Sequence, residues 1–130
     1  MSMMKLMNLL EKAMSGSTAR HNVISNNISN VNTPGFKRSD VDFCSVLDEA
    51  MNPQLEMNTT SALHINNSIK SNKPLVIQDE QTSLRTDGNN IDIDIELATL
   101  AENNLYFNSL THFLSSQLSL LRQSISEGRR

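Results

Sequence analysis

The N-terminal part of the chain carries a regular stripe of apolar side chains. Counting from Met3 in alternating steps of four and three, seven of nine positions are apolar. This spacing keeps one face of a helix against a partner helix, as in a coiled coil. The pattern predicts a helix that ends near residue 31 and packs through Met7, Leu10, Met14, Ile24, Ile28 and Val31.

A second stripe with the same spacing runs through the C-terminal part. Counting from Ile93 in the same way, eight of ten positions are apolar. Asp92, Asp94 and Glu96 place acceptors and negative charge where a helix start favours them, and Gly128 is placed to end the helix. The predicted packing side chains are Leu97, Leu100, Phe107, Leu114, Leu118, Leu121 and Ile125.

The segment between the stripes shows little periodicity. Thr33-Pro34-Gly35 predicts a turn, because proline keeps the preceding residue out of helical geometry and glycine accepts a positive φ. Leu75-Val76-Ile77 is a short candidate strand, and Asp87-Gly88-Asn89-Asn90 predicts a turn before the second helix.

These elements predict a mainly α protein that forms one structural unit. We expect an N-terminal helix over residues 1–33 and a C-terminal helix over residues 91–130, packed as an antiparallel, coiled-coil-like pair. Residues 34–90 are expected to form a turn and an irregular, partly mobile middle region with at most a short β element.

Polar residues interrupt both stripes and suggest how the two helices align. If the helices lie antiparallel with position numbers that add up to 128, Ser17 faces Thr111 and Leu10 faces Leu118. Polar positions within an apolar seam can fix the alignment of two helices at a cost in stability. We therefore predict this register.

Composition and charge exclude several functions. Hydrophobic residues make up 38% of the chain and aromatic residues 4%, so the core is thin and partners are expected to complete the burial. The net charge of −3 argues against nucleic-acid binding, which depends on clustered Lys and Arg. The short basic pairs Lys37-Arg38 and Arg129-Arg130 are interpreted as solvated surface. Because the apolar runs are too short to span a bilayer, we expect no direct membrane insertion.

The sequence offers no convincing catalytic, cofactor or metal site, and we expect a protein that is not an enzyme. Cys44 is the only cysteine, and the histidines lack the spacing of metal ligands. Acids and amides between Asp87 and Glu96 resemble a calcium loop, but such a loop needs glycine at its sixth position and Gly88 stands second. The histidines are His21, His64 and His112.

The most specific motif spans the end of the first helix. Ser25-Asn26-Asn27-Ile28-Ser29-Asn30 is followed by Thr33-Pro34-Gly35-Phe36. Asparagine is unfavourable inside a helix because its amide competes for backbone hydrogen bonds. Surface exposure would explain these residues. The alternative, which the family resemblance given below favours, is that the amides of Asn22, Asn26, Asn27 and Asn30 bond across contacts between subunits.

This motif resembles the signature of the flagellar rod and hook protein family, Ala-Asn-Asn-Ile-Ala-Asn followed by Thr-Pro-Gly-aromatic, with serine in place of both alanines. Two further segments, 38–43 and 87–92, and the short length are similar to subunits of the proximal rod. The residues that match the signature are Asn26, Asn27, Ile28, Asn30, Thr33, Pro34, Gly35 and Phe36.

The resemblance implies a structural subunit of the proximal rod of the flagellar basal body, located in the periplasm. It also implies export by the flagellar type III apparatus without a cleavable signal peptide. The implied partners are further copies of the chain, other rod subunits and basal-body ring or adaptor proteins. A small helical adaptor or export chaperone of the same secretion system is the alternative function.

Phe43 and Leu47 match a short element, Phe-x-x-x-apolar, that early exported subunits of this family are thought to present to the export gate. The match implies the same role for these two residues. Local packing of both side chains is the alternative explanation.

Overall fold

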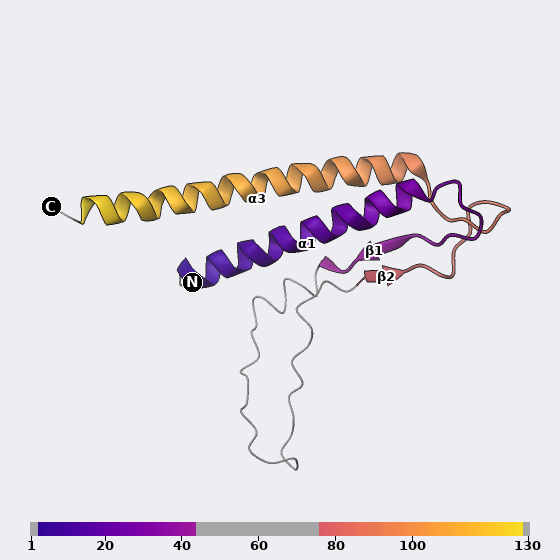
Figure 1. The fold of residues 1–130 in the computed structure, drawn as a ribbon, viewed down its shortest axis with the longest axis horizontal. Coiled ribbons are helices and arrows are strands. Elements are labelled where there is room, and N and C mark those ends of the chain that lie inside the picture. The colour runs from indigo at the N-terminus through magenta and orange to yellow at the C-terminus, as the bar shows by residue number, and fades with distance from the viewer. Residues whose placement is uncertain (1–2, 44–75, 129–130) are drawn as a thin grey trace, which may run out of the picture.

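A computed structural model describes residues 3–43 and 76–128 of the chain. Its elements in chain order are helix α1 (Met3–Ser29), strand β1 (Ser39–Val41), strand β2 (Val76–Gln78) and helix α3 (Ile93–Glu127). Two long helices and one small sheet confirm the predicted mainly α fold (Figure 1). Cys44, Leu47 and His64 lie outside the described residues, as does much of the middle region predicted to be irregular.

The two helices run antiparallel, as predicted, and differ in length (Figure 1). The 27 residues of α1 correspond to about 40 Å and the 35 residues of α3 to about 52 Å at 1.5 Å per residue. The C-terminal part of α3 therefore continues past the N-terminal end of α1. Within the described part of the chain, neither helix has the length and apolar character needed to cross a membrane.

Local side chains set both ends of α3. Asp92 is the N-cap, and its carboxylate accepts hydrogen bonds from the backbone N–H groups of Asp94 at 3.0 Å and Ile95 at 3.4 Å. These bonds satisfy N–H groups that have no partner inside the helix. The helix ends at Glu127, directly before Gly128, where the sequence predicted its end.

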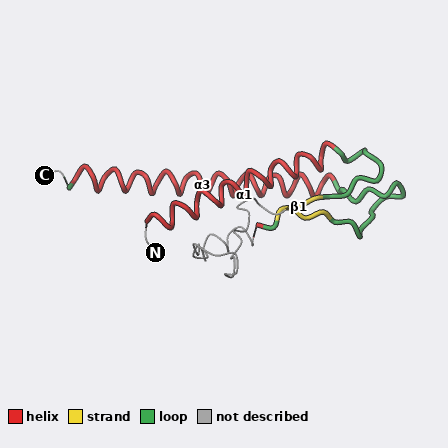
Figure 2. The backbone as a smooth tube through the Cα atoms, turned by 60° about the horizontal axis from the view of Figure 1, so that its bottom comes forward, coloured by secondary structure: helices red, strands yellow, loops and turns green. Residues whose placement is uncertain are grey.

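The two strands form a small antiparallel sheet beside α1. Ser39 pairs with Gln78 and Val41 with Val76. The strand predicted around Val76 is confirmed, whereas β1 was not predicted, because its three residues show too little alternation of apolar and polar side chains. An ion pair of 3.5 Å between Arg20 and Asp40 links α1 to β1. Figure 1 shows α1 between α3 and the sheet, and Figure 2 shows the strands leading into the loops at the end of the molecule where α1 ends and α3 begins.

Polar residues take an unusually large share of the interior. Among the described residues, the buried apolar side chains are Leu10, Ala13, Ile24, Val41 and Ile91. The buried polar or charged side chains are at least as numerous: Ser17, Asn27, Asn89, Asn90, Glu96 and Asn103. Because an unpaired buried polar group is costly, the hydrogen bonds of these six residues must hold the fold together.

The register predicted from the sequence is wrong. Ser17 is bonded to Asn103, eight residues before the predicted partner Thr111. The buried and half-buried side chains of α3 that face α1 follow a stripe that begins at Glu96, whereas the predicted stripe begins at Ile93. Its members alongside α1 include Glu96, Leu100, Asn103, Phe107, Leu110, Leu114 and Gln117. The alignment of the two helices is therefore set by buried hydrogen bonds. It is not set by matching the positions at which polar residues interrupt the two apolar stripes.

Candidate functional site

Asn27 connects the last turns of α1 to β1 and to α3. Its side chain is 1% exposed. The amide oxygen accepts from the backbone N–H of Ser39 at 3.1 Å, and the amide nitrogen donates to the Ser39 carbonyl at 2.8 Å and to Glu96 Oε2 at 3.3 Å. The side chain thus satisfies both backbone groups of Ser39, as a neighbouring strand would. The amide group of Asn27 is therefore hydrogen-bonded to residues of its own chain.

Glu96 lies fully buried in the first turn of α3, where two donors share its carboxylate. Oε2 accepts from Asn27, and Oε1 accepts from Nε of Arg38. Burial opposes the charge of Arg38, but the hydrogen bond from Arg38 to Glu96 and the nearby carboxylates of Glu96 and Asp40 outweigh it and raise the pKa of Arg38. Arg38 was interpreted from the sequence as solvated surface; instead it is half-buried and pairs with Glu96.

Asn89 holds the turn that follows α1 from a distant part of the chain. Its fully buried amide nitrogen lies 3.0–3.1 Å from the carbonyl oxygens of Asn30, Val31 and Thr33. Its amide oxygen accepts from the backbone N–H of Ile91 at 2.7 Å. These carbonyls belong to the turn that follows α1, so this one amide fastens that turn to the segment before α3.

Asn90 performs a similar role for the strands. Its amide oxygen accepts from the backbone N–H of Arg38 at 2.6 Å. Its amide nitrogen donates to the Asp79 carbonyl at 3.0 Å and to Thr82 Oγ1 at 2.9 Å. We call the group of Asn27, Arg38, Asn89, Asn90 and Glu96 the polar junction, because it joins both helices, both strands and the turn before α3.

Two glycines let the turns at the polar junction approach one another. Gly35 has φ +70° and Gly88 has φ +83°, so the positive φ expected at Gly35 is confirmed. The backbone N–H of Gly35 donates to the Asp87 carbonyl at 2.9 Å. A side chain at Gly88 would stand 3.7 Å from the Cα of Gly35. Positive φ values disfavour other residues, which explains glycine at both positions.

A second buried polar contact lies midway along the helix pair. The Ser17 hydroxyl donates to Asn103 Oδ1 at 3.0 Å, and Asn103 Nδ2 donates back to the Ser17 carbonyl at 3.0 Å. Both residues are buried. We call this contact the mid-helix pair. The reciprocal geometry satisfies the hydroxyl and the amide together, which a purely apolar contact would not require.

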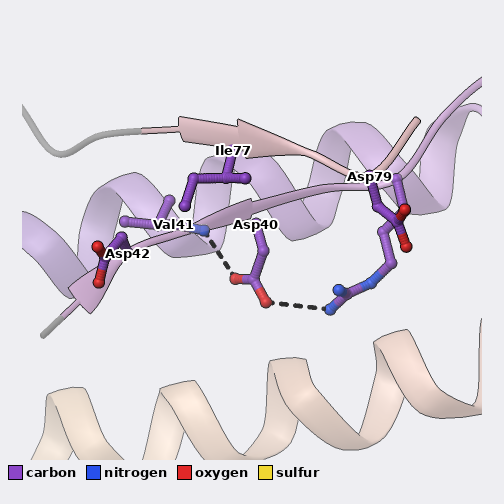
Figure 3. Close-up of a pocket in the computed structure, with 6 residues that line it drawn as sticks. Asp40, Val41, Asp42, Ile77 and Asp79 are labelled. Atoms are coloured by element: carbon purple, nitrogen blue, oxygen red, sulfur yellow. Dashed lines mark hydrogen bonds and ion pairs between the residues drawn. The ribbon is translucent and has the colours of Figure 1, made fainter. Parts of the chain in front are cut away.

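A shallow pocket opens beside the sheet (Figure 3). Asp40 accepts from the backbone N–H of Val41 at 2.7 Å and from the Arg38 guanidinium at 3.3 Å. Hydrogen bonds from the Thr82 side chain and from backbone N–H groups lower the pKa of Asp79. Both carboxylates are thus used within the chain, and the described residues contain no cluster of three metal-ligating side chains. The lining residues are Arg38, Asp40, Val41, Asp42, Ile77 and Asp79.

The C-terminal part of α3 presents an apolar surface. Leu118 is 47% exposed and Ile125 is 74% exposed, and Leu121 lies between them on the same face. Counting back from the mid-helix pair places Met3 opposite Gln117. The face that packs against α1 therefore continues beyond the end of α1, where residues 3–43 and 76–128 supply no helix to cover it. We call Leu118, Leu121 and Ile125 the distal surface.

The predicted packing residues divide into three groups. Leu10 and Ile24 are buried. Leu97, Leu118 and Ile125 are exposed, because Glu96 takes the position facing α1 beside Leu97 and the other two lie beyond α1. The half-buried residues are Met7, Met14, Ile28, Val31, Leu100, Phe107, Leu114 and Leu121.

The signature residues gather around the polar junction, but only Asn27 is buried among them. Asn30 donates to the carbonyl and to the side-chain oxygen of Asn26, so both amides bond within α1 and its end. The half-buried signature residues are Ile28, Asn30 and Phe36, and the exposed ones are Asn26, Thr33, Pro34 and Gly35. A role for Asn22, Asn26 and Asn30 between subunits stays a prediction.

Phe43, from the predicted export element, packs against α3. Its ring meets that of Tyr106 edge-on, with ring centroids 5.4 Å apart and an interplanar angle of 86°. Leu47 lies outside the described residues. The ring contact gives Phe43 a packing role in the folded chain.

Sequence reasoning missed the partners that make the site. Glu96 was interpreted as a helix-start acid and Asn89 as part of a turn, and Asn103 was not among the predicted packing residues. The available signal was the helical spacing itself. Counting in steps of four and three from Glu96 passes through Asn103 and then through the apolar residues Phe107, Leu110 and Leu114 before it reaches Gln117.

Comparison with known proteins gives a consistent picture. The family model described as "Flagella basal body rod protein" matches residues 7–37, which include the signature and most of α1. The flagellar basal body rod protein FlgB of Bacillus subtilis is 30% identical over 120 residues, which cover 92% of each chain. FlgB of Aeromonas hydrophila is 31% identical over 125 residues, covering 93% of this chain and 92% of the relative. FlgB of Borreliella burgdorferi is 34% identical over 101 residues, covering 72% and 75%.

Proposed function

Since the chain belongs to the FlgB family of flagellar basal body rod proteins, we propose that it is a structural subunit of the proximal rod. Its terminal helices build part of the axle that transmits motor torque, and the cell needs it for motility. The comparisons do not favour the alternative of a small helical adaptor or export chaperone, because the relatives match along nearly the whole chain.

The observation that supports assembly most directly is the distal surface. The α3 stripe that packs against α1 continues past Met3 into Leu118 and Ile125, which are exposed. Burying one leucine or isoleucine stabilises a contact by roughly 1.5–3 kcal/mol, so this surface favours association. A helix of another copy or of a related rod subunit would continue the packing that α1 begins.

The remaining partners follow from the family. We propose contacts with basal-body ring or adaptor proteins and passage through the type III export apparatus without a cleavable signal peptide, which places the assembled subunit in the periplasm. We assign no catalytic role, because the family is one of structural rod proteins. Since the Phe43 ring packs on Tyr106 in the folded chain, recognition at the export gate would act on the unfolded chain.

Deletion of the gene tests the proposal. We expect cells without flagella, in which electron microscopy of isolated basal bodies shows the rod to be missing. Expression of the chain from a plasmid should restore rods and swimming. Deletion cells with intact flagella would overturn the proposal, and so would deletion cells that assemble complete rods but fail only in later steps.

A further inference from the structure

The apolar stripes of the two helices do not by themselves select one alignment. In the structure, counting seven residues away from the mid-helix pair in each helix places Leu10 opposite Leu110. A slide of eight residues, about 12 Å along the axis, would place Leu10 opposite Leu118 instead. Leucine meets leucine in both alignments, so apolar burial discriminates poorly between them.

The buried polar residues distinguish the two alignments. After the slide, Asn103 would face Ser25, and Asn27 would be carried the same eight residues away from Glu96, to a place opposite Asn104. The mid-helix pair and the Asn27–Glu96 hydrogen bond would both be lost. A buried polar group without a partner lowers the population of a state about tenfold or more.

The slide would also change what the molecule offers to its neighbours. In the observed alignment Met3 lies opposite Gln117, and α3 residues 118–127 project beyond α1. In the slid alignment Met3 would lie opposite Ile125, and α1 would cover the distal surface within the same chain. The choice of alignment therefore decides whether that surface is open.

We propose that Ser17 and Asn103, together with Asn27 and Glu96, are positioning residues that hold α1 and α3 in one alignment and thereby keep the distal surface open for a neighbouring subunit. The part of this inference that concerns assembly rests on the proposed function. The part that concerns alignment can be tested on the purified chain alone.

Disulfide trapping reports the alignment. In a Cys44→Ser background, Leu10→Cys with Leu110→Cys reports the observed alignment, and Leu10→Cys with Leu118→Cys reports the slid one. Oxidised monomers, separated from dimers by mass, measure the intramolecular product. With the polar residues intact, we expect efficient closure of the first pair and at least about tenfold less of the second. Equally efficient closure of the second pair would overturn the proposal.

The decisive variant is Ser17→Ala with Asn103→Leu. Replacing both partners by apolar groups removes the hydrogen bonds without leaving a buried group unpaired, so the helices should stay folded. We expect closure of the slid pair to rise at least about fivefold. A folded variant that closes only the first pair would overturn the proposal. If circular dichroism shows that this double variant loses helix, Ser17→Ala alone is tested by the same disulfide trapping. Increased closure of the slid pair would again support the proposal, and closure of only the first pair would overturn it.

The chain offers a matched control for this variant. Thr18 and Asn104 stand directly beside Ser17 and Asn103 but are exposed, and the Thr18 hydroxyl bonds to Met14 in its own helix. Thr18→Ala with Asn104→Leu makes the same chemical change and should leave the trapping pattern unaltered. If closure of the slid pair rises equally in this control, general loss of polarity rather than loss of the mid-helix pair controls the alignment. That result would also overturn the proposal.

Trapping is measured without a rod, so its outcome does not depend on the proposed function. Swimming of cells that carry Ser17→Ala with Asn103→Leu tests the assembly part separately, and we expect it to be reduced. If the trapping changes as expected but these cells swim normally, the link between alignment and assembly is refuted, while the assignment as a rod subunit stands.

Discussion

The two ends of the helix pair are held by different kinds of contact. At the polar junction, buried amides and the ion pair between Arg38 and Glu96 join α1, α3 and the sheet. At the other end, α3 extends beyond α1 and carries apolar side chains that face solvent in the isolated chain. One end satisfies its own polar groups, and the other leaves its apolar groups to a partner.

This difference separates folding from assembly. A polar network needs donors and acceptors placed to within a few tenths of an ångström, which one chain can provide by itself. Apolar contact is non-directional and tolerates a change of partner. Substitutions at the polar junction should therefore destabilise the subunit, whereas substitutions at the distal surface should leave the subunit folded and weaken its association.

The largest loss of stability is expected for Glu96→Ala. This change leaves Arg38 and Asn27 without their shared acceptor in a buried setting, and we expect the free energy of unfolding to fall by about 3 kcal/mol. Urea unfolding followed by circular dichroism measures the change. Glu102→Ala, an exposed carboxylate on the same helix, should alter stability by less than about 0.5 kcal/mol. Equal effects of the two substitutions would contradict a special role for Glu96.

The adjacent asparagines of the signature provide a matched pair. Asn27→Ala leaves both backbone groups of Ser39 unpaired and should cost about 2 kcal/mol of stability. Asn26→Ala removes an exposed acceptor of Asn30 and should cost about 0.5 kcal/mol or less. Thermal melting of both variants checks the contrast. If Asn26→Ala proves as destabilising as Asn27→Ala, burial is not what distinguishes them.

A smaller loss is expected for Gly35→Val. Gly35 has φ +70°, and a side chain there would meet no neighbouring atom within 4 Å, so the cost is backbone strain of about 1–2 kcal/mol. Gly35→Asn should cost less, because asparagine tolerates a positive φ better than valine does. Melting temperatures in the order glycine, asparagine, valine would agree with this account, and a variant with valine that melts like the original would refute it.

Leu118→Ser should leave stability nearly unchanged and still damage assembly. Leu118 is 47% exposed and lies beyond α1, so the isolated chain gains little from its burial. Gln123→Ser, which shortens an exposed side chain on another face of α3, serves as the control. We expect unchanged urea unfolding for both variants and impaired swimming for Leu118→Ser alone. Normal rods and swimming with Leu118→Ser would show that the distal surface is not an assembly contact.

Local sequence patterns were sufficient for both helices and for β2, but not for β1 or for the alignment of the helices. The apolar stripes, the Asp92 cap and the turn at Gly35 each depend on a few neighbouring residues, and all were predicted. The contacts that align the helices join residues 69 and 86 positions apart. The same spacing of apolar residues is compatible with more than one alignment, so the periodicity alone does not select among them.

The interior of the site was missed for a related reason. Glu96 can act as a helix-start acid or as a buried acceptor, and only the position of Arg38, 58 residues away, decides between the two. Asn103 and Asn104 are identical in type, and their environments differ by a rotation of one residue about the helix axis. Residue type indicates what a side chain can bond to, whereas packing decides whether it does.

The antiparallel pairing of Val41 with Val76 makes the segment between the two strands a natural place for protein engineering. β1 ends and β2 begins at directly opposed positions, which are tied to the helices through Arg20, Arg38 and Asn90. The entropy of closing the linkers that flank an inserted tag grows only with the logarithm of their length. A fluorescent tag or an epitope inserted there would be fastened at both ends to the same small sheet, leaving both helix termini free for polymerisation.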